Sequence, residues 1–168
     1  VLSLLPLSGQ GINLGTGADR NVMRSNTLET SGLSGISLLD ASSNTIELNV
    51  LQGNASAGIT ITGIGVGSDL NVIRGNISRR NNTGFAVSGV RSGNIFTQNT
   101  ADSNASYGFT VAASGAAVSS DTFQKNVIVT GTGRPDSGVS NTVLVSKVEF
   151  TRNFWMRGGV GTTDSGVI

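Results

Sequence analysis

The sequence predicts an all-β fold, a right-handed parallel β-helix, in which a single chain winds into about six coils of 23–27 residues. Three features of the sequence indicate it. A six-residue segment that ends in Asn recurs at coil spacing, a Gly followed by an alternating strand recurs between its copies, and alignment of the copies gives columns of like residues. Internal repeats of this period are typical of solenoids.

The six-residue segment begins with Asn in its four clear copies and has a large apolar residue in third place. Its closing asparagines are spaced by 23, 27, 23, 27 and 27 residues, and they are Asn26, Asn49, Asn76, Asn99, Asn126 and Asn153. Asn tolerates left-handed backbone angles, and its carboxamide can hydrogen-bond the equivalent carboxamides of neighbouring coils. We therefore interpret this column as a structural Asn ladder at a turn of each coil.

The second feature is a Gly followed by a strand whose side chains alternate between apolar and polar. It starts at Gly11, Gly35, Gly58, Gly84 and Gly108, with a weaker copy at Gly138. Such alternation predicts a strand with one buried face, so each coil contains at least two short strands. The spacing from this Gly to the Asn motif lengthens at residues 64–69 and 114–121, which predicts loop extensions at one corner. A third extension, residues 131–137, is expected at another corner.

Alignment of the copies gives the third feature, columns that repeat a residue type. One column is large and apolar in every copy and is expected to face inward; it contains Met23, Ile46, Ile73, Phe96, Phe123 and Phe150. The next column begins Arg24, Glu47 and Arg74, so we expect charges to pair across adjacent parallel strands. An antiparallel sandwich has turns at similar intervals but does not predict such columns, so the β-helix is the favoured fold.

The whole chain, residues 1–168, is interpreted as one β-helix domain. Residues 1–10 are expected to form an N-terminal strand or cap, residues 11–153 the coils, and residues 154–168 a C-terminal cap. Terminal coils of a solenoid expose unpaired strand edges. We therefore expect self-association through the solenoid ends, an oligomer or a larger parent protein.

Composition excludes several kinds of chemistry. The chain has no Cys and no His, which removes thiol catalysis, Ser-His-Asp catalysis and the commonest zinc ligands. Only 12% of the residues are charged, the net charge is +1 and the basic residues are scattered, so nucleic acid is not expected as a partner. No segment reaches the ~18 apolar residues of a membrane span. The neutral polar surface that Ser, Thr and Asn provide predicts an extracellular or cell-surface location.

The pattern N-x-[IVF]-x-x-N followed by G-[IF]-x-[LVI] resembles the parallel β-helix repeat of the pectate-lyase-like superfamily, which also occurs in NosD-like proteins, alginate epimerases and surface β-solenoids. The resemblance covers Gly11 to Asn153 and implies the fold. It does not imply one activity, because this fold supports many functions. The chain lacks the G-H-G motif of the hydrolases and the D-P-H motif of the alginate epimerases; its only Asp close to a Pro lies in Arg134-Pro135-Asp136.

Pectate lyases bind Ca²⁺ through clustered carboxylates, so the resemblance raises the question of a Ca²⁺ cofactor. Here the aspartates are spread along the chain, and Asp19, Asp69 and Asp121 are expected to share one corner on alternate coils. Carboxylates on alternate coils would lie ~10 Å apart, too far to share one Ca²⁺. We therefore expect these aspartates to cap turns, and we expect no metal or other cofactor.

Two classes of function are consistent with these features. The favoured one is a non-catalytic extracellular β-solenoid, a structural, fibre or adhesin-like module that binds glycans on a lateral face, with Tyr107 and Trp155 as candidates for sugar stacking. The alternative is a polysaccharide lyase or glycoside hydrolase, or a fragment of one, that acts on an acidic polysaccharide. The candidate catalytic residues are then Arg74, Arg79, Asp69 and Asp102. Arg79 and Asp102 are at equivalent positions on adjacent coils, where we expect a surface salt bridge.

Overall fold

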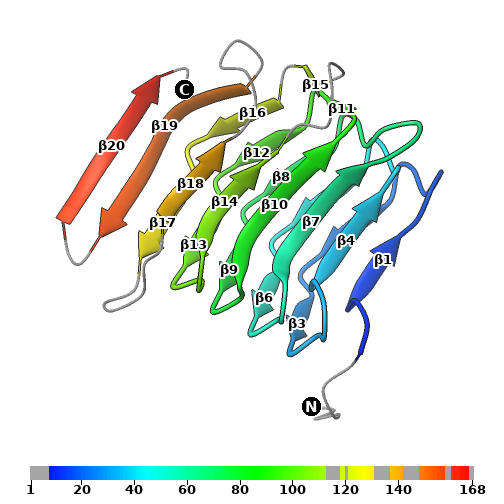
Figure 1. Ribbon diagram of the computed structural model, residues 1–168, viewed down its shortest axis with the longest axis horizontal. Coiled ribbons are helices and arrows are strands. Elements are labelled where there is room, and N and C mark those ends of the chain that lie inside the picture. Colours follow the sequence, from blue (N-terminus) through cyan, green and yellow to red (C-terminus); the bar gives the residue numbers. More distant parts are fainter. Residues whose placement is uncertain are drawn as a thin grey trace.

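The computed structural model describes residues 8–112, 118–119, 121–130, 137–141, 148–157 and 160–166. These residues contain strands and turns and no helix. The strands stack in parallel as a right-handed solenoid, and the chain makes about five turns between its first and last coils (Figure 1). The predicted fold class is therefore confirmed.

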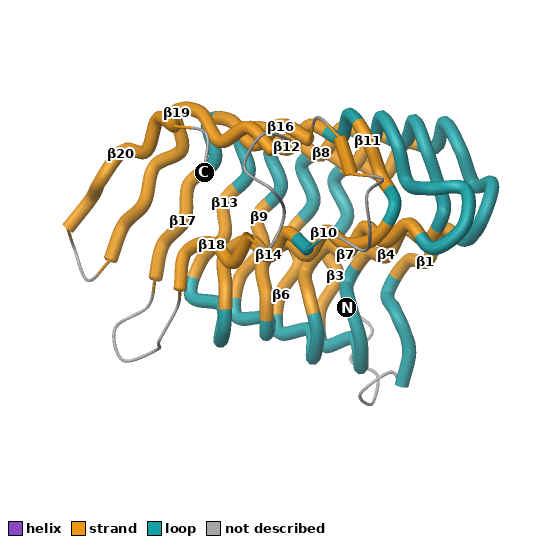
Figure 2. The backbone as a smooth tube through the Cα atoms, turned by 45° about the horizontal axis from the view of Figure 1, so that its top comes forward, coloured by secondary structure: helices purple, strands orange, loops and turns teal. Residues whose placement is uncertain are grey.

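The solenoid has three faces, each a parallel sheet (Figures 1 and 2). The first face contains β1 (Ile12–Leu14), β4 (Ile36–Leu39), β7 (Ala57–Gly63), β10 (Thr83–Gly89), β14 (Tyr107–Val111) and β18 (Ser137–Asn141). The second face contains β2 (Val22–Arg24), β5 (Thr45–Glu47), β8 (Val72–Arg74), β12 (Ile95–Thr97) and β16 (Asp121–Gln124). The third face contains β3 (Thr27–Glu29), β6 (Val50–Gln52), β9 (Ile77–Arg79), β13 (Thr100–Asp102) and β17 (Val127–Thr130).

The C-terminal strands depart from this arrangement. The long strand β19 (Val148–Arg157) pairs first with β16 and then with β17, so it joins the second and third faces. The last strand, β20 (Val160–Gly166), pairs antiparallel with β19 and lies at the end of the solenoid (Figure 1). Two short strands, β11 (Arg91–Ser92) and β15 (Val118–Ser119), pair at the corner between the first and second faces.

The observed register places the apolar columns inside the solenoid, as the sequence predicts. Met23, Ile46, Ile73, Phe96 and Phe123 pair in register on the second face and are all buried. The phenylalanine rings stack along the axis, with ring centroids 4.7 Å apart for Phe96 and Phe123 and also for Phe85 and Phe109. Each core side chain therefore buries itself mainly on its equivalents one coil away.

The Gly column lets the third face pack closely against the first. A Cβ atom at Gly58 would overlap Oγ of Ser78 on the third face. One at Gly84 would lie 3.0 Å from Cβ of Ala101 on the third face and would overlap the Gly108 carbonyl oxygen of the next coil. Neither position leaves room for a methyl group, because non-bonded carbon and oxygen atoms need a separation of at least about 3 Å. The glycines that mark each coil in the sequence are therefore sites of close approach between faces.

The corner turns are made by the residue before the ladder Asn, not by Asn itself. Ser25 and Leu48 have φ of 56°, and Gly75 at the equivalent position has φ of 63°. The left-handed residue was expected to be the ladder Asn, and the structure places it one position earlier, so that expectation is wrong. The reason lies in the hydrogen bonds, because each ladder Asn must direct both its backbone N–H and its carboxamide at the next coil.

Three Asn ladders run along the solenoid, one at each corner. In the ladder seen in the sequence, the backbone N–H and Nδ2 of Asn49 both donate to Oδ1 of Asn76 at 3.0 Å. Nδ2 of Asn76 then donates to the Ile46 carbonyl at 2.9 Å and to Oδ1 of Asn99 at 3.0 Å. A second ladder comprises Asn21, Asn44, Asn71, Asn94 and Asp121, and a third comprises Ser31, Asn54, Asn81 and Asn104.

The loop extension at residues 64–69 follows β7 at the corner between the first and second faces, as predicted. Of the extension at residues 114–121, the described part is β15 and Asp121. The extension at residues 131–137 lies outside the described residues except for Ser137. The proposed N-terminal cap likewise falls mostly outside them, since description begins at Ser8.

Candidate functional site

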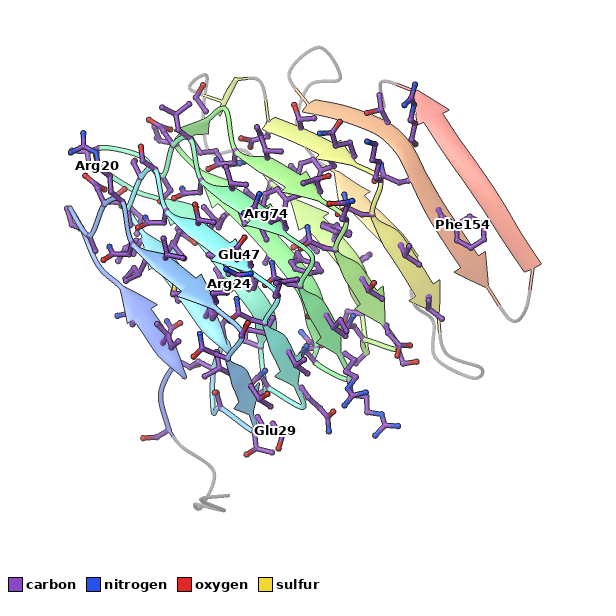
Figure 3. All side chains as sticks on the ribbon, turned by 180° about the vertical axis from the view of Figure 1, so that it is seen from behind. Arg20, Arg24, Glu29, Glu47, Arg74 and Phe154 are labelled. Atoms are coloured by element: carbon purple, nitrogen blue, oxygen red, sulfur yellow. The ribbon has the colours of Figure 1, made fainter. Side chains whose placement is uncertain are left out.

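The second face carries a row of alternating charges. Glu47 on β5 lies between Arg24 on β2 and Arg74 on β8, with Nε of Arg24 3.4 Å and Nη2 of Arg74 2.5 Å from its carboxylate oxygens (Figure 3). The Glu47 side chain is 8% exposed, whereas those of Arg24 and Arg74 are 63% and 54% exposed. The row, which we call the arginine row, therefore presents two guanidinium groups to solvent around one covered carboxylate. It confirms the predicted pairing of charges across strands.

The remaining outward positions of the second face are uncharged from β5 to β16. Next to the arginine row, β12 and β16 contribute Thr97 and Gln124, which are partly buried. A parallel column of outward residues is aliphatic or Thr, and it contains Val22, Thr45, Val72, Ile95 and Thr122. The outward side of the second face is therefore uncharged from β2 to β16 except at the arginine row, where two arginines and one glutamate leave a net charge of +1.

The candidate catalytic residues do not come together. Arg74 lies on the second face, whereas Arg79 and Asp102 are neighbours on the third face. Asp69 is at the corner before the second face, where its N–H donates to Oγ of Ser42 at 3.0 Å. The four residues therefore occupy three separate places on the solenoid.

The expected salt bridge between Arg79 and Asp102 does not form. The two residues pair in register, so their predicted equivalence is right. However, Nε of Arg79 donates to Oε1 of Gln52 at 2.6 Å, one coil earlier, and Asp102 accepts the Ser103 hydroxyl at 2.7 Å. The ion pairs between described residues do not include either side chain.

The corner aspartates divide into two columns. Oδ1 of Asp19 accepts the N–H of Ser42 at 2.7 Å, so Asp19 caps the turn of the next coil as expected. Asp121 belongs instead to an Asn ladder, where its Oδ1 accepts the N–H of Asn94 at 2.9 Å. All three aspartates thus lie at the corner before the second face, as expected, but Asp121 occupies the ladder position of that corner, whereas Asp19 and Asp69 lie two residues before it. No group of three acidic residues close enough to hold a metal ion occurs among the described residues.

The proposed sugar-stacking residues lie on different strands and faces. Tyr107 begins β14 on the first face and is partly buried. Trp155 pairs in register with Ile128 on the third face, and its side chain lies outside the described part. A shared aromatic platform is therefore not built from these two positions.

The structure contains a buried ion pair that the sequence did not predict, between Arg91 and Asp121. Nε of Arg91 donates to Oδ2 of Asp121 at 2.6 Å, and both side chains are fully buried. Arg91 also donates through Nη1 to the carbonyls of Gly89 and Ala112. Burial raises the pKa of the Asp121 carboxyl, although Arg91 and Asn94 act in the opposite direction. The sequence signal was an Asp at a ladder position where the other coils have Asn.

The loop extension is pinned by the Asp40 carboxylate, which gives a prediction for acid conditions. Oδ1 of Asp40 accepts the N–H groups of Ile64, Gly65 and Gly67 at 2.8, 3.1 and 3.1 Å. These bonds, that of Ile64 first, hold the pKa of Asp40 below its ordinary value. The stabilisation is present at neutral pH and is lost as pH falls through the folded-state pKa, below about pH 4.

Urea unfolding of the natural chain and of Asp40→Asn should therefore show a stability difference that shrinks as the solution is acidified below about pH 4. The natural chain should lose its advantage because its carboxylate becomes protonated and the loop N–H groups lose a charged acceptor. A difference that stays constant from neutral to acid pH would show that the charge of Asp40 does not hold the loop.

Comparison with known proteins agrees with this architecture. Residues 7–128 match the family described as the right-handed β-helix region, and the chain belongs to this family. No relative was found among curated protein sequences. No helix long and apolar enough to cross a membrane occurs among the described residues.

Two solved structures are similar to the chain over most of its length. One is the periplasmic alginate epimerase AlgG, with a TM-score of 0.63 and 18% identity over 84% of this chain and 36% of that one. The other is a point mutant of the same enzyme, with a TM-score of 0.62 at the same identity and coverage. At this identity the likeness shows the fold, and the chain spans about a third of the length of AlgG.

Proposed function

We propose that the chain is a non-catalytic β-solenoid module of a secreted or envelope protein and that it binds an acidic polysaccharide along its second face. The observation that supports this most directly is the arginine row. Arg24 and Arg74 expose guanidinium groups two coils apart on the second face, whose outward positions other than the arginine row are uncharged from β2 to β16. Two coils correspond to ~10 Å along the axis, so an extended polymer lying along the solenoid can meet both groups.

Glu47 has a clear role in this arrangement. Its covered carboxylate lies between the two arginines and holds both side chains in place. Each arginine therefore loses less conformational entropy when it binds an anion. Guanidinium groups recognise carboxylates through paired N–H donors. A single exposed pair contributes under about 1 kcal/mol, so affinity should depend on contacts repeated along a polymer. The proposed ligand is therefore a uronate-containing chain of several sugars and not a monosaccharide.

Binding of such a polymer should be sensitive to Arg74. We expect Arg74→Ala to weaken the affinity for a soluble polyuronate about fivefold, since it removes one exposed charge contact of about 1 kcal/mol. Arg79→Ala is the matched control, because it removes an exposed Arg from the third face, and its affinity should stay within about twofold of the natural chain. Isothermal titration calorimetry with a polyuronate and with a neutral glucan measures both effects.

Equal binding of the neutral glucan, or an equal loss in the Arg79→Ala variant, would contradict recognition by the arginine row. Added salt gives a second check, because exposed charge contacts weaken as screening increases.

An enzyme remains the second candidate, and the structural likeness to an alginate epimerase favours it. Against it, the structure separates Arg74 from Arg79 and Asp102 by a corner of the solenoid, and the chain has no His. A lyase would release an unsaturated product that absorbs in the ultraviolet, and an epimerase would change the uronate composition of the polymer. Either change, lost in an Arg74→Ala or Arg79→Ala variant, would establish the enzyme.

A further inference from the structure

Two exposed cations lie next to each other at the corner between the second and third faces. Lys125 comes directly after β16, and Arg152 is at the equivalent position on β19, one coil later. The Lys125 N–H donates to the Thr151 carbonyl at 3.1 Å. Both cations have left-handed backbone angles, with φ of 55° and 54°, and both side chains are exposed. The corner therefore carries positive charge on two adjacent coils, whose backbones are ~5 Å apart.

Neither cation has an acidic partner among the described residues. The ion pairs there do not include Lys125 or Arg152. The neighbouring outward residue on β16 is the uncharged Gln124, and Glu149 on β19 pairs in register with Thr122, in the other outward column. Like charges at equivalent positions of adjacent strands repel each other. An anion bound between the two cations would therefore remove an unfavourable interaction.

These cations continue the arginine row with a regular period. The second face stacks β2, β5, β8, β12 and β16 in that order, and the last three follow one another along the axis (Figure 2). Arg24 is on β2, Arg74 is on β8 and Lys125 follows β16, so a cation recurs on every second coil. The coils between them contribute Glu47, which the arginines cover, and the uncharged Thr97. Positive sites therefore follow one line at intervals of ~10 Å.

An extended 1,4-linked uronan has a matching period. In a two-fold ribbon each sugar is turned over relative to its neighbour, so successive carboxylates point to opposite edges of the ribbon. The carboxylates of one edge therefore recur at every second sugar. An extended pyranose advances the chain by about the spacing of one coil, so two sugars advance it by about two coils. A ribbon lying along the axis thus brings a carboxylate to each positive site in turn.

Exposed aliphatic residues on the same face suit the flat side of such a ribbon. Val22 and Ile95 lie in the outward column beside the arginine row, and both are exposed. The C–H groups of a pyranose ring form an apolar surface, which aliphatic side chains can cover. The face therefore offers apolar contact to the sugar rings and charge to one edge of the ribbon.

We propose that the second face selects an extended uronan ribbon and that Lys125, together with Arg152, binds a carboxylate beyond those bound by Arg24 and Arg74. This inference rests on the proposed binding of an acidic polysaccharide to the second face. It adds two binding residues to that site and names the class of polymer, a uronan whose carboxylates on one edge recur at every second sugar. The two-coil period of the cations is the observation that supports it.

Calorimetric titration of the 168-residue chain with β-1,4-linked oligoglucuronates tests the proposal, and cello-oligosaccharides of the same length are the neutral controls. A glucuronate hexamer should bind at least about threefold more tightly than a trimer, because the trimer spans a single two-coil interval. Lys125→Gln should weaken hexamer binding about threefold, and Lys125→Gln with Arg152→Gln about tenfold. In both variants the affinity for the trimer, which Arg24 and Arg74 still bind, should change by no more than about twofold.

Two further variants provide the controls. Arg80→Gln is matched to Lys125→Gln, because Arg80 is exposed and also has φ of 55° but lies at the corner after β9. It should leave both affinities unchanged. Gln98→Lys, added to Lys125→Gln, returns the lost charge one coil too early, so it should not restore hexamer binding. Circular dichroism establishes that the variants are folded, since all the changed side chains are exposed.

The outcomes separate this inference from the proposed function. If Arg74→Ala weakens hexamer binding and Lys125→Gln does not, this inference is wrong and polysaccharide binding by the arginine row stands. Full recovery by Gln98→Lys would also overturn the inference, because general attraction by positive charge would then explain the effect of Lys125. Equal binding of the glucuronate and cello-oligosaccharide hexamers, or no binding of either, would overturn the proposed function and this inference with it.

Discussion

Replacement of Asn76 by Ala is expected to reduce the free energy of unfolding by about 4 kcal/mol. The variant loses the Oδ1 atom that accepts the N–H and Nδ2 of Asn49, and it loses the donor to the Ile46 carbonyl. The Asn49 N–H and the Ile46 carbonyl are then left without these partners in a buried corner, where an unsatisfied polar group costs about 1–3 kcal/mol. The missing side chain also leaves a small cavity, which adds to the cost.

Urea unfolding followed by circular dichroism measures this effect, and Asn82→Ala provides the control. Asn82 is exposed, and its side chain accepts one bond, from the Ser106 hydroxyl at 2.9 Å. Its replacement should change stability by no more than about 0.5 kcal/mol. Similar losses in the two variants would mean that the ladder does not hold the coils together.

Loss of Arg91 should destabilise the fold by a comparable amount. Arg91→Met leaves the buried Asp121 carboxylate without its cation, and removal of one partner of a buried pair costs about 3–5 kcal/mol. The raised pKa of Asp121 should then rise further, because burial acts without the opposing charge. An acid whose folded-state pKa is raised loses stability as pH increases, so Arg91→Met should be relatively more stable in acid than at neutral pH.

The double variant Arg91→Met, Asp121→Asn provides the matching test. It removes the charge and restores the carboxamide found at the equivalent position of the other coils, so the new side chain can accept the bonds of Asn94. We expect it to recover at least about 2 kcal/mol of the loss in Arg91→Met, as seen for buried ion pairs replaced as a unit. Thermal unfolding of the single and double variants at several pH values measures the recovery of stability and its pH dependence. A double variant less stable than Arg91→Met would contradict a ladder position that prefers Asn.

The parts of the fold that could be predicted from sequence are those where neighbouring coils impose the same residue type. The columns of Met23 and Asn76 repeat because each buried side chain packs on its own equivalents or hydrogen-bonds to them. The column of Gly58 repeats because a Cβ atom there would overlap its neighbours. The third strand of each coil left a weaker signal because its inward column repeats no single residue type; the column contains Leu28, Leu51, Ser78, Ala101 and Ile128. The left-handed corner residues left none, because hydrogen bonding by the following Asn decides their conformation.

The candidate site could be predicted only in part, for a similar reason. The register that aligns Arg24, Glu47 and Arg74 follows from the repeat, so their ion pairs could be predicted. Register also aligns Arg79 with Asp102. However, a long exposed side chain can reach several partners, and Arg79 donates to Gln52 instead. Asp121 replaces a ladder Asn, but its partner Arg91 lies 30 residues earlier and outside the repeated motif, so only the structure reveals the pair.

The most direct test of polysaccharide binding on the second face is nuclear magnetic resonance of the labelled chain, titrated with a polyuronate oligosaccharide. The proposal predicts chemical-shift changes concentrated on β2, β5, β8 and β12, strongest near Arg24 and Arg74, while the sugar spectrum shows an unaltered oligosaccharide. Changes centred on the first or third face, or conversion of the sugar during the titration, would contradict a non-catalytic module that binds through the arginine row.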